Sequence, residues 1–238
     1  MSYKKCTAIV LAAGKGKRMN STIQKQYLPI MDKPVLYYSL KAFEESFIED
    51  IIIVTSEDEI GYIKENIVKK YNFSKVLKTV AGGRERYHSV AAGLEAVSKD
   101  TGYVFIHDSA RPFIDGKLLE RAYETVSEYH TAVAAMPVKD TIKVADDKGI
   151  VTDTPDRSTL YIIQTPQVFD HFMIKEAYRR LIEDERKGVV FNRPVTDDAM
   201  VMERYGSLPV KLYEGSYRNI KITTKEDMLT ANAIATYF

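Results

Sequence analysis

LAAGKGKRMNSTIQKQY, residues 11–27, turns from an apolar run into a loop that carries two glycines and four lysines or arginines. The apolar residues 8–11 are typical of a buried strand, so the loop lies at the C-terminal end of that strand. In open α/β sheets this is the edge where ligands bind. Glycine lets the backbone approach a ligand and present N–H groups to phosphate. The stretch therefore predicts an anion site at the edge of an α/β sheet, with a solvated strand-to-helix turn as the alternative.

Two common phosphate loops do not fit this stretch. A Walker loop needs a lysine and then a serine or threonine after its second glycine, whereas Lys17 and Arg18 follow Gly16. The dinucleotide fingerprint needs a third glycine at the position where Met19 stands. A dinucleotide-dependent reductase is disfavoured on this ground, and also because no suitable helix carries a Tyr-x-x-x-Lys pair.

The composition is that of an ordinary globular protein with a sizeable core. Of the 238 residues, 45% are hydrophobic and 28% are charged. Thirty-four basic residues against thirty-three acidic ones give a net charge of +1, which argues against nucleic-acid or membrane binding through a basic surface. The cations of residues 15–25 are therefore a local feature of this loop.

Cysteine usage and hydropathy indicate the compartment. The single cysteine, Cys6, excludes an intrachain disulfide and favours a reducing environment. The apolar run before Gly14 is short for a signal peptide and lacks a cleavage context. No stretch approaches the roughly 20 apolar residues that a membrane span needs. We therefore expect a cytoplasmic protein.

Strand-like and helix-like segments alternate along most of the chain. Apolar, β-branched runs alternate with amphipathic segments up to residue 136, which predicts a mostly parallel, Rossmann-like sheet with helices on both faces. We expect the residues 1–238 to form a single domain. The expected strands are 8–11, 51–55, 76–80, 103–106, 132–136, 160–163, 210–213 and 220–223, and the expected helices begin near residues 34, 60, 87, 116, 170, 196 and 224.

Residues 139–158 interrupt this alternation. They have almost no large apolar side chains and contain the turn sequence DDKG at residues 146–149, which predicts a projecting β-hairpin arm. Because an isolated hairpin is only marginally stable in water, we expect the arm to pack on a partner surface.

The loops that follow the predicted strands bring charged side chains to one edge of the sheet. Several cations and one carboxylate are expected there, which suits a polyphosphate and a divalent metal or a sugar hydroxyl. Asp108 is the carboxylate, although a residue at this place is also a common turn former. His107 and Ser89 have no partners at metal-ligand or nucleophile spacing. The cations are Arg18, Lys25, Arg84, Arg86, Arg111 and Lys221.

The order and spacing of seven segments make the chain resemble the 2-C-methyl-D-erythritol 4-phosphate cytidylyltransferase family. The resemblance covers about residues 6–235 and implies a nucleotidyltransferase-type sheet. Two positions depart from the family pattern, Ser109 and Tyr161, where alanine and tryptophan are more usual. The segments are LAAGKGKRM…KQYLPI, AGGRERYHSV, HDSARPF, PVKDTIK, DRSTLYIIQTPQVF, TDDAMVME and GSYRNIKITTKEDML.

The resemblance implies transfer of CMP from CTP to a sugar-alcohol phosphate, with release of pyrophosphate and with Mg²⁺ as the cofactor. Arg18 and Lys25 would be the catalytic cations at the α-phosphate. Asp108 would contact Mg²⁺ or the ribose. The remaining nucleotide-binding residues would be Ala12, Ala13, Gly14, Gly83, Arg86 and Ser89, and the acceptor would be positioned by Arg157, Lys221, Thr141 and Arg111.

The resemblance also implies a homodimer, in which the arms of two subunits clasp each other and Arg157 reaches the neighbouring site. D-ribitol-5-phosphate cytidylyltransferase has the same architecture and is the alternative function, although it tends to carry valine where Ala110 stands. A catalytically inactive nucleotide sensor or scaffold is the alternative of another class. It is disfavoured because Arg18, Lys25, Arg157 and Lys221 are all present.

Overall fold

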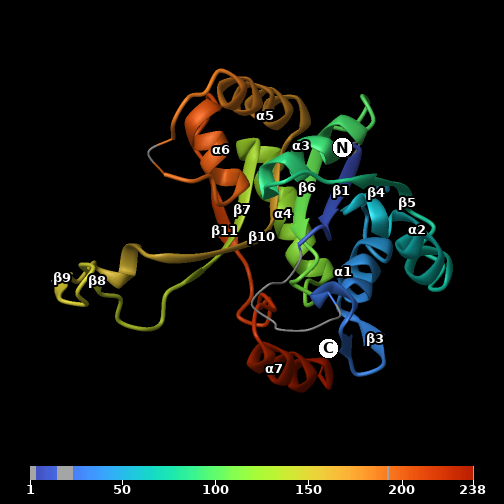
Figure 1. Ribbon diagram of the computed structural model, residues 1–238, viewed down its shortest axis with the longest axis horizontal. Coiled ribbons are helices and arrows are strands. Elements are labelled where there is room, and N and C mark those ends of the chain that lie inside the picture. Colours follow the sequence, from blue (N-terminus) through green and yellow to red (C-terminus); the bar gives the residue numbers. More distant parts are fainter. Residues whose placement is uncertain (1–3, 15–23, 192, 238) are drawn as a thin grey trace.

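The apolar run before the first glycine loop forms a strand near the middle of a seven-stranded sheet (Figure 1). The computed structural model describes residues 4–14, 24–191 and 193–237. One strand, β10, is antiparallel to both of its neighbours, and the other pairs are parallel, so the predicted mostly parallel sheet is confirmed. In spatial order the strands are β11 (Leu212–Glu214), β7 (Thr131–Pro137), β10 (Tyr161–Asp170), β6 (Tyr103–Asp108), β1 (Cys6–Leu11), β4 (Asp50–Thr55) and β5 (Val76–Ala81).

Helices cover both faces of the sheet, as predicted. Successive residues of β1 point to opposite faces, so that Val10 packs with α1 and α4 in one core and Ile9 packs with α3 and α5 in the other. Both cores are fully buried, which explains why the central strands read as continuous apolar runs. The helices are α1 (Val35–Glu44), α2 (Ile60–Ile63, continued by a π-helical turn at Lys64–Lys69), α3 (Arg86–Ala96), α4 (Gly116–Tyr129), α5 (His171–Arg186), α6 (Asp198–Tyr205) and α7 (Lys225–Ala235).

A hairpin projects from the body of the molecule between β7 and β10 (Figure 1). Its strands are β8 (Val144–Ala145) and β9 (Val151–Asp153), which pair antiparallel. The side chain of Asp146 closes the turn by accepting from the backbone N–H groups of Lys148 and Ile150, each at 2.9 Å. The predicted arm is therefore present, and its residues 139–154 are exposed in this single chain.

In the C-terminal part of the chain, the structure corrects one predicted strand and confirms one predicted helix start. Residues 220–223 were expected to form a strand, but they run as irregular chain, because the N–H of Ile222 donates to the carbonyl of Ala110 instead of to a neighbouring strand. Thr224 begins α7 with the predicted capping box, in which Asp227 is the reciprocal partner. The helix α7 packs on a small hairpin of β2 (Pro29–Ile30) and β3 (Lys33–Pro34). Among the described residues, no helix is long and apolar enough to cross a membrane.

Candidate active site

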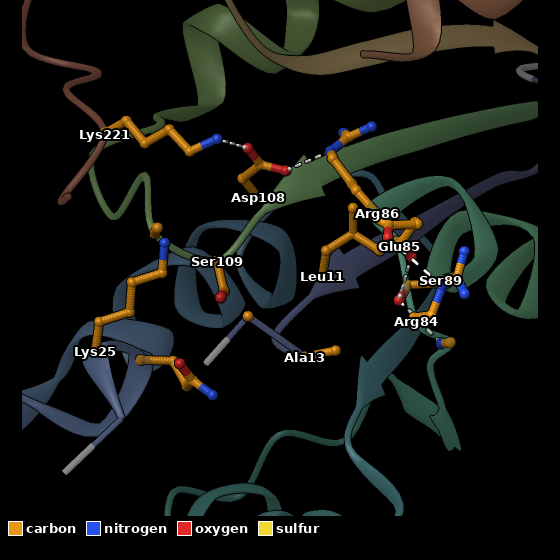
Figure 2. A pocket seen from close by; sticks show the side chains of 14 residues that line it. Leu11, Ala13, Lys25, Arg84, Glu85, Arg86, Ser89, Asp108, Ser109 and Lys221 are labelled. Carbon is orange, nitrogen blue, oxygen red and sulfur yellow. Dashed lines mark hydrogen bonds and ion pairs between the residues drawn. The ribbon is translucent and has the colours of Figure 1, made fainter. Parts of the chain in front are cut away.

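A pocket of about 640 Å³ opens at the C-terminal edge of the parallel strands (Figure 2). In the sheet register Leu11, the last residue of β1, is the partner of Asp108, the last residue of β6. The register therefore sets the first glycine loop beside the HDSARP loop, as the edge rule for α/β sheets predicts. The lining residues are Leu11, Ala13, Gly14, Lys25, Gln26, Gly83, Arg84, Glu85, Arg86, Ser89, Asp108, Ser109, Ala110 and Lys221.

The first loop is fixed to the sheet by a glutamine. The N–H of Ala12 donates to the carbonyl of Val54 at 2.7 Å, and the carbonyl of Ala12 accepts from the amide of Gln26, also at 2.7 Å. Gln26 is buried, so this bond ties the short helical turn at Lys25–Tyr27 to the end of β1. Lys25 thereby lies over the glycine, since a Cβ added to Gly14 would stand 3.7 Å from its Cε. Arg18 lies outside the described residues.

The second loop, which follows β5, lies directly against the first turn of α3. A Cβ on Gly82 would stand 2.6 Å from Oγ of Ser89, and one on Gly83 would stand 2.3 Å from Cβ of His88. Ser89 Oγ accepts from the N–H of Gly83 at 3.2 Å, and His88 Nδ1 accepts from the N–H of Glu85 at 3.2 Å. The two glycines are needed here because no side chain fits, and Gly83 lines the pocket.

Asp108 is paired with two cations from different parts of the chain (Figure 2). Its Oδ2 accepts from Nζ of Lys221 at 2.6 Å, and its Oδ1 accepts from Nε of Arg86 at 3.2 Å. Burial disfavours the charged carboxylate, but Arg86 and Lys221 outweigh it and hold the pKa of Asp108 well below its usual range. Asp108 is therefore a permanent anion at physiological pH, and it organises the cations around it.

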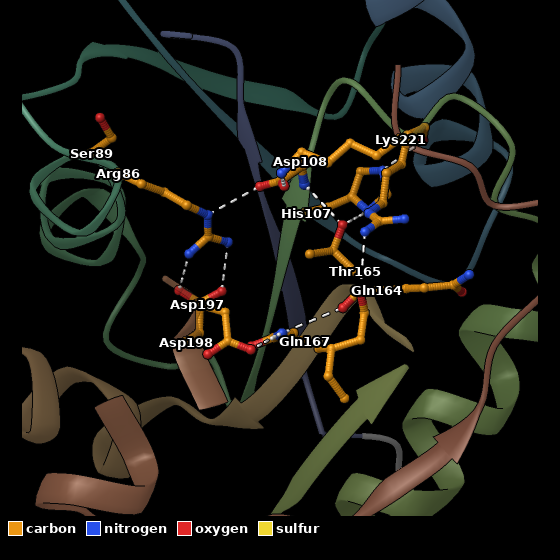
Figure 3. A network of polar contacts seen from close by, with 12 residues as sticks. Arg86, Ser89, His107, Asp108, Gln164, Thr165, Gln167, Asp197, Asp198 and Lys221 are labelled. Carbon is orange, nitrogen blue, oxygen red and sulfur yellow. Dashed lines mark hydrogen bonds and ion pairs between the residues drawn. The ribbon is translucent and has the colours of Figure 1, made fainter. Parts of the chain in front are cut away.

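Arg86 is in turn held by a second buried carboxylate, Asp198 of α6 (Figure 3). Its two terminal nitrogens each donate to Asp198 at 2.8 Å, and the hydroxyl of Tyr178 donates to the same carboxylate. Burial and the charge of Asp198 raise the pKa of Tyr178, so the phenol remains protonated and is able to donate. Burial opposes the charge of Arg86, but Asp198 and Asp108 raise its pKa well above the ordinary value.

Arg111 and Asn219 position the segment that carries Lys221. Nη1 of Arg111 donates to the carbonyl of Asn219 at 2.8 Å, and Nη2 donates to the carbonyl of Ile163 at 3.2 Å. The amide of Asn219, which is fully buried, donates to the carbonyl of Thr165 at 2.8 Å. These bonds hold residues 219–222 in place although this segment does not pair with a strand of the sheet, and they place Lys221 beside Asp108.

The structure brings together most of the residues that the sequence assigned to the site. Figure 2 shows Lys25 and Lys221 on one side of the pocket and Arg84, Arg86 and Ser89 on the other, with Asp108 between them. Of the predicted residues that the structure describes, four do not line it. Ala12 is buried, and its backbone N–H and carbonyl are both hydrogen-bonded. Both terminal nitrogens of Arg111 donate to backbone carbonyls. Thr141 and Arg157 are exposed in and beside the arm, where Arg157 donates to the carbonyl of Lys139 at 3.0 Å.

Two residues that support the site from behind or beside it, Asp198 and Gln26, had no such role assigned from the sequence. Asp198 was placed only at a helix start, but Asp197 is the N-cap of α6, and Asp198 turns inward to Arg86. No sequence signal separates them, because either aspartate could cap a helix through the N–H three residues later, as Asp197 does at Met200. Gln26 carried no signal, because a single glutamine beside a lysine in a loop has no pattern that indicates a structural role.

A magnesium ion would find few protein ligands here. In the part of the chain that the structure describes, no group of three His, Cys, Asp or Glu side chains could hold a metal. Magnesium commonly takes one or two protein carboxylates and completes its shell with substrate phosphates and water. The donor set therefore fits a magnesium ion that is shared between Asp108 and a bound triphosphate.

Comparisons with known proteins identify the family of the chain. The sequence matches the family described as 2-C-methyl-D-erythritol 4-phosphate cytidylyltransferase over residues 6–237. It is 54% identical to the enzyme of that name from Lachnospira eligens, over 93% of this chain and 95% of the relative, and 48% identical to that from Lachnoclostridium phytofermentans, over 97% and 96%. The crystal structure of 4-diphosphocytidyl-2C-methyl-D-erythritol synthase from Anaerococcus prevotii superposes with a TM-score of 0.83 at 33% identity, covering 98% of this chain and 96% of the other. This chain is a member of the 2-C-methyl-D-erythritol 4-phosphate cytidylyltransferase family.

Proposed function

We propose that this chain transfers CMP from CTP to 2-C-methyl-D-erythritol 4-phosphate and releases pyrophosphate, as a step in isoprenoid precursor synthesis. A phosphate oxygen of the acceptor attacks the α-phosphorus of CTP, and the bond from that phosphorus to the bridging oxygen breaks, so that pyrophosphate leaves with the electron pair. The observation that carries the proposal is the ring of cations around the pocket, with Lys25 and Lys221 facing Arg84 and Arg86.

The difficulty of this reaction is charge repulsion, because a phosphate monoester approaches a polyanionic nucleotide. Fixed cations lower the barrier by stabilising the negative charge that develops on the transferred phosphoryl group, and no covalent intermediate is required. Lys25 is proposed to act at the α-phosphate, with Arg18 as its partner. Lys221 is proposed to hold the acceptor phosphate, on the side of Asp108 that faces away from Arg86.

The glycine loop after β5 is proposed to bind the nucleoside. Its exposed backbone at Gly83 and the hydroxyl of Ser89 lie together at the wall opposite Lys25. Because the backbone already contacts the side chains of α3, a base enters only where the glycines leave space. Magnesium, when bound, would screen the charge of the triphosphate, and Asp108 is the side chain that would hold it.

The test is CTP-dependent release of pyrophosphate, measured with 2-C-methyl-D-erythritol 4-phosphate and with D-ribitol 5-phosphate side by side. We expect a much larger kcat/KM for the first acceptor, and loss of activity when magnesium is chelated and its return when magnesium is added. A preference for ribitol phosphate would overturn the proposed acceptor. No turnover of CTP with either acceptor would leave only the sensor or scaffold alternative.

The arm is proposed to form a homodimer and to complete the neighbouring site. Its exposed side chains include apolar ones, such as Ile142, Val144, Ile150 and Val151, which have no cover within this chain. Arg157 and Thr141 are exposed there and do not line the pocket of their own chain. An arm that clasps a second copy would cover the apolar side chains and bring Arg157 to the acceptor phosphate of its partner.

Co-expression of two inactive variants tests this shared site. If each site uses Lys25 of one chain and Arg157 of the other, a heterodimer of Lys25→Ala and Arg157→Ala has one site with both lesions and one intact site. Random pairing makes about half of the dimers mixed, so about a quarter of all sites regain activity. If purified heterodimers show only the residual activity of the two parents, Arg157 acts within its own chain or not at all.

The cytoplasmic location, expected from the single cysteine, remains a prediction.

A further inference from the structure

Arg86 lies between two carboxylates, and two of its three hydrogen bonds to them go to Asp198 (Figure 3). Both terminal nitrogens donate to Asp198 at 2.8 Å, whereas Asp108 accepts at Oδ1 from Nε alone, at 3.2 Å. Two parallel N–H groups that face both oxygens of a carboxylate form the strongest pairing a guanidinium offers. Asp198 therefore has the stronger hold on Arg86, and Asp108 has the weaker one.

The weaker hold on Asp108 leaves its second oxygen to Lys221. The Nζ of Lys221 lies 2.6 Å from Oδ2 of Asp108, while Arg86 contacts Oδ1 alone. A guanidinium that presented two N–H groups to Asp108 would compete for Oδ2. The side chain of Lys221 is 38% exposed and stands on irregular chain, so this ion pair is important for the direction in which its ammonium group points.

Asp198 is itself held firmly enough to orient another side chain. It is completely buried, and it accepts from the hydroxyl of Tyr178 on α5. The first turn of α6 is attached to β10 by Gln167, whose Oε1 accepts from the N–H of Ala199 at 2.8 Å and whose Nε2 donates to Asp197 at 3.0 Å. A carboxylate fixed by three packed elements is well suited to a supporting role behind a site.

We propose that Asp198 is a positioning residue for the acceptor side of the reaction. By accepting from both terminal nitrogens of Arg86, it orients the guanidinium so that Nε alone contacts Asp108, and the other oxygen of Asp108 is left for Lys221. The inference rests on the proposed function in one respect, which is the assignment of the acceptor phosphate to Lys221. Asp198 does not line the pocket and acts only through the chain of contacts from Arg86 to Asp108 and Lys221.

The charges of these four side chains predict that loss of the Asp198 charge affects the two substrates differently. Asp198 and Asp108 balance Arg86 and Lys221, so removal of the charge of Asp198 leaves the group with one excess positive charge. A more positive pocket does not weaken the binding of a triphosphate. The released fork of Arg86 turns to Asp108 and displaces Lys221, which weakens the hold on the acceptor. The two substrates are therefore expected to respond differently.

The experiment compares Asp198→Asn with Asp197→Asn by steady-state kinetics with CTP and 2-C-methyl-D-erythritol 4-phosphate. We expect Asp198→Asn to raise the KM for the acceptor roughly tenfold or more, the effect of losing a charged hydrogen bond. The KM for CTP should rise much less than that for the acceptor, because Arg86 keeps its charge in the pocket after it turns. Asp197→Asn removes the same charge one residue away and can still cap α6 with its amide oxygen, but it loses the bond that Asp197 accepts from Gln167. It should therefore affect both KM values slightly and equally, without the selectivity for the acceptor.

Two further variants separate a positioning role from a loss of stability. In a Lys221→Met background, Asp198→Asn should add much less to the KM for the acceptor than it does alone, because both changes break the same chain of contacts. Tyr178→Phe removes one donor from Asp198, and it should shift the same KM in the same direction by less. It also tests the idea if Asp198→Asn does not fold. Equal effects on both substrates, full additivity with Lys221→Met, or identical behaviour of the two aspartate variants would overturn the proposal.

A crystal structure of the Asp198→Asn protein gives a readout that does not depend on the acceptor. The proposal expects two nitrogens of Arg86 on Asp108 and no contact between Asp108 and Lys221. Unchanged pairing of Lys221 with Asp108 would overturn it. If the wild-type enzyme used neither acceptor, the proposed function would fail, whereas the structure of the variant would still decide the role of Asp198.

Discussion

Lowering the pH from about 7.5 to about 5 is expected to destabilise the folded protein through His107. This side chain is fully buried at the end of β6, and both of its ring nitrogens are used. Nε2 lies 3.0 Å from the carbonyl of Arg111 and must donate, so Nδ1, 3.0 Å from the hydroxyl of Thr165, accepts. A second proton on the ring would face that hydroxyl, and burial lowers the pKa of His107 from 6.5 to about 4.

The sign and the size of the effect follow from this shift. Between pH 6.5 and about pH 4 the unfolded chain binds a proton at His107 that the folded chain does not, so stability falls as the pH falls. At about pH 5 the unfolded histidine is about 1.5 pKa units above the pH, which at about 1.4 kcal/mol per unit gives a loss of about 2 kcal/mol. His171, whose pKa is also lowered by burial, acts in the same direction.

Urea unfolding of the wild type and of His107→Gln, each at about pH 7.5 and about pH 5, isolates this contribution. The glutamine amide can still donate to the carbonyl of Arg111 but does not titrate. We expect the variant to be less stable at the higher pH and to lose about 2 kcal/mol less than the wild type when the pH is lowered. His171 and the carboxylates are common to both proteins and cancel in the comparison. An equal loss in the two proteins would refute the assignment of a neutral, buried His107.

Other changes to the site give equally direct tests. Lys25→Ala should lower kcat about a hundred- to a thousand-fold with a smaller change in the KM for CTP, and near-normal kcat would remove this lysine from the chemistry. Gly83→Ala places a Cβ 2.3 Å from Cβ of His88 and should raise the KM for CTP. Gly61→Ala is the control and should leave this KM unchanged, because a Cβ at Gly61 would meet no atom within 4 Å. Asn219→Ala removes the donor to a buried carbonyl and should destabilise the protein by about 1–3 kcal/mol in thermal or urea unfolding; an unchanged stability would show that the carbonyl finds another donor.

The sheet and its ligand-binding edge could be predicted because they depend on local pattern. The apolar runs at 8–11 and 103–106 are too short and too β-branched for helices, and parallel pairing then places Leu11 beside Asp108. The same reasoning failed for residues 220–223. They have the composition of a strand, but the N–H of Ile222 donates to the carbonyl of Ala110, and a local pattern does not contain that tertiary preference.

The hydrogen-bond and ion-pair partners of the site residues could not be predicted from the sequence, for a similar reason. Asp108 could be located as a strand end, but its contact with Lys221 joins residues 113 positions apart through irregular chain. Asp197 and Asp198 are chemically identical neighbours, and only the direction of the first turn of α6 decides which one caps the helix and which one reaches Arg86. The contribution of Arg157 stays a prediction from the family resemblance.

The distance along the chain between Asp108 and Lys221 has a consequence for protein synthesis. A ribosome adds about 5–20 residues per second, so at least several seconds pass between the appearance of the carboxylate and that of the lysine. During this interval the nascent chain has the glycine loops and Lys25 but lacks Lys221, the lysine that pairs with Asp108. The pairing of Asp108 with Lys221 therefore forms only after almost the whole chain has been made, and a copy that stops before residue 221 lacks this ion pair.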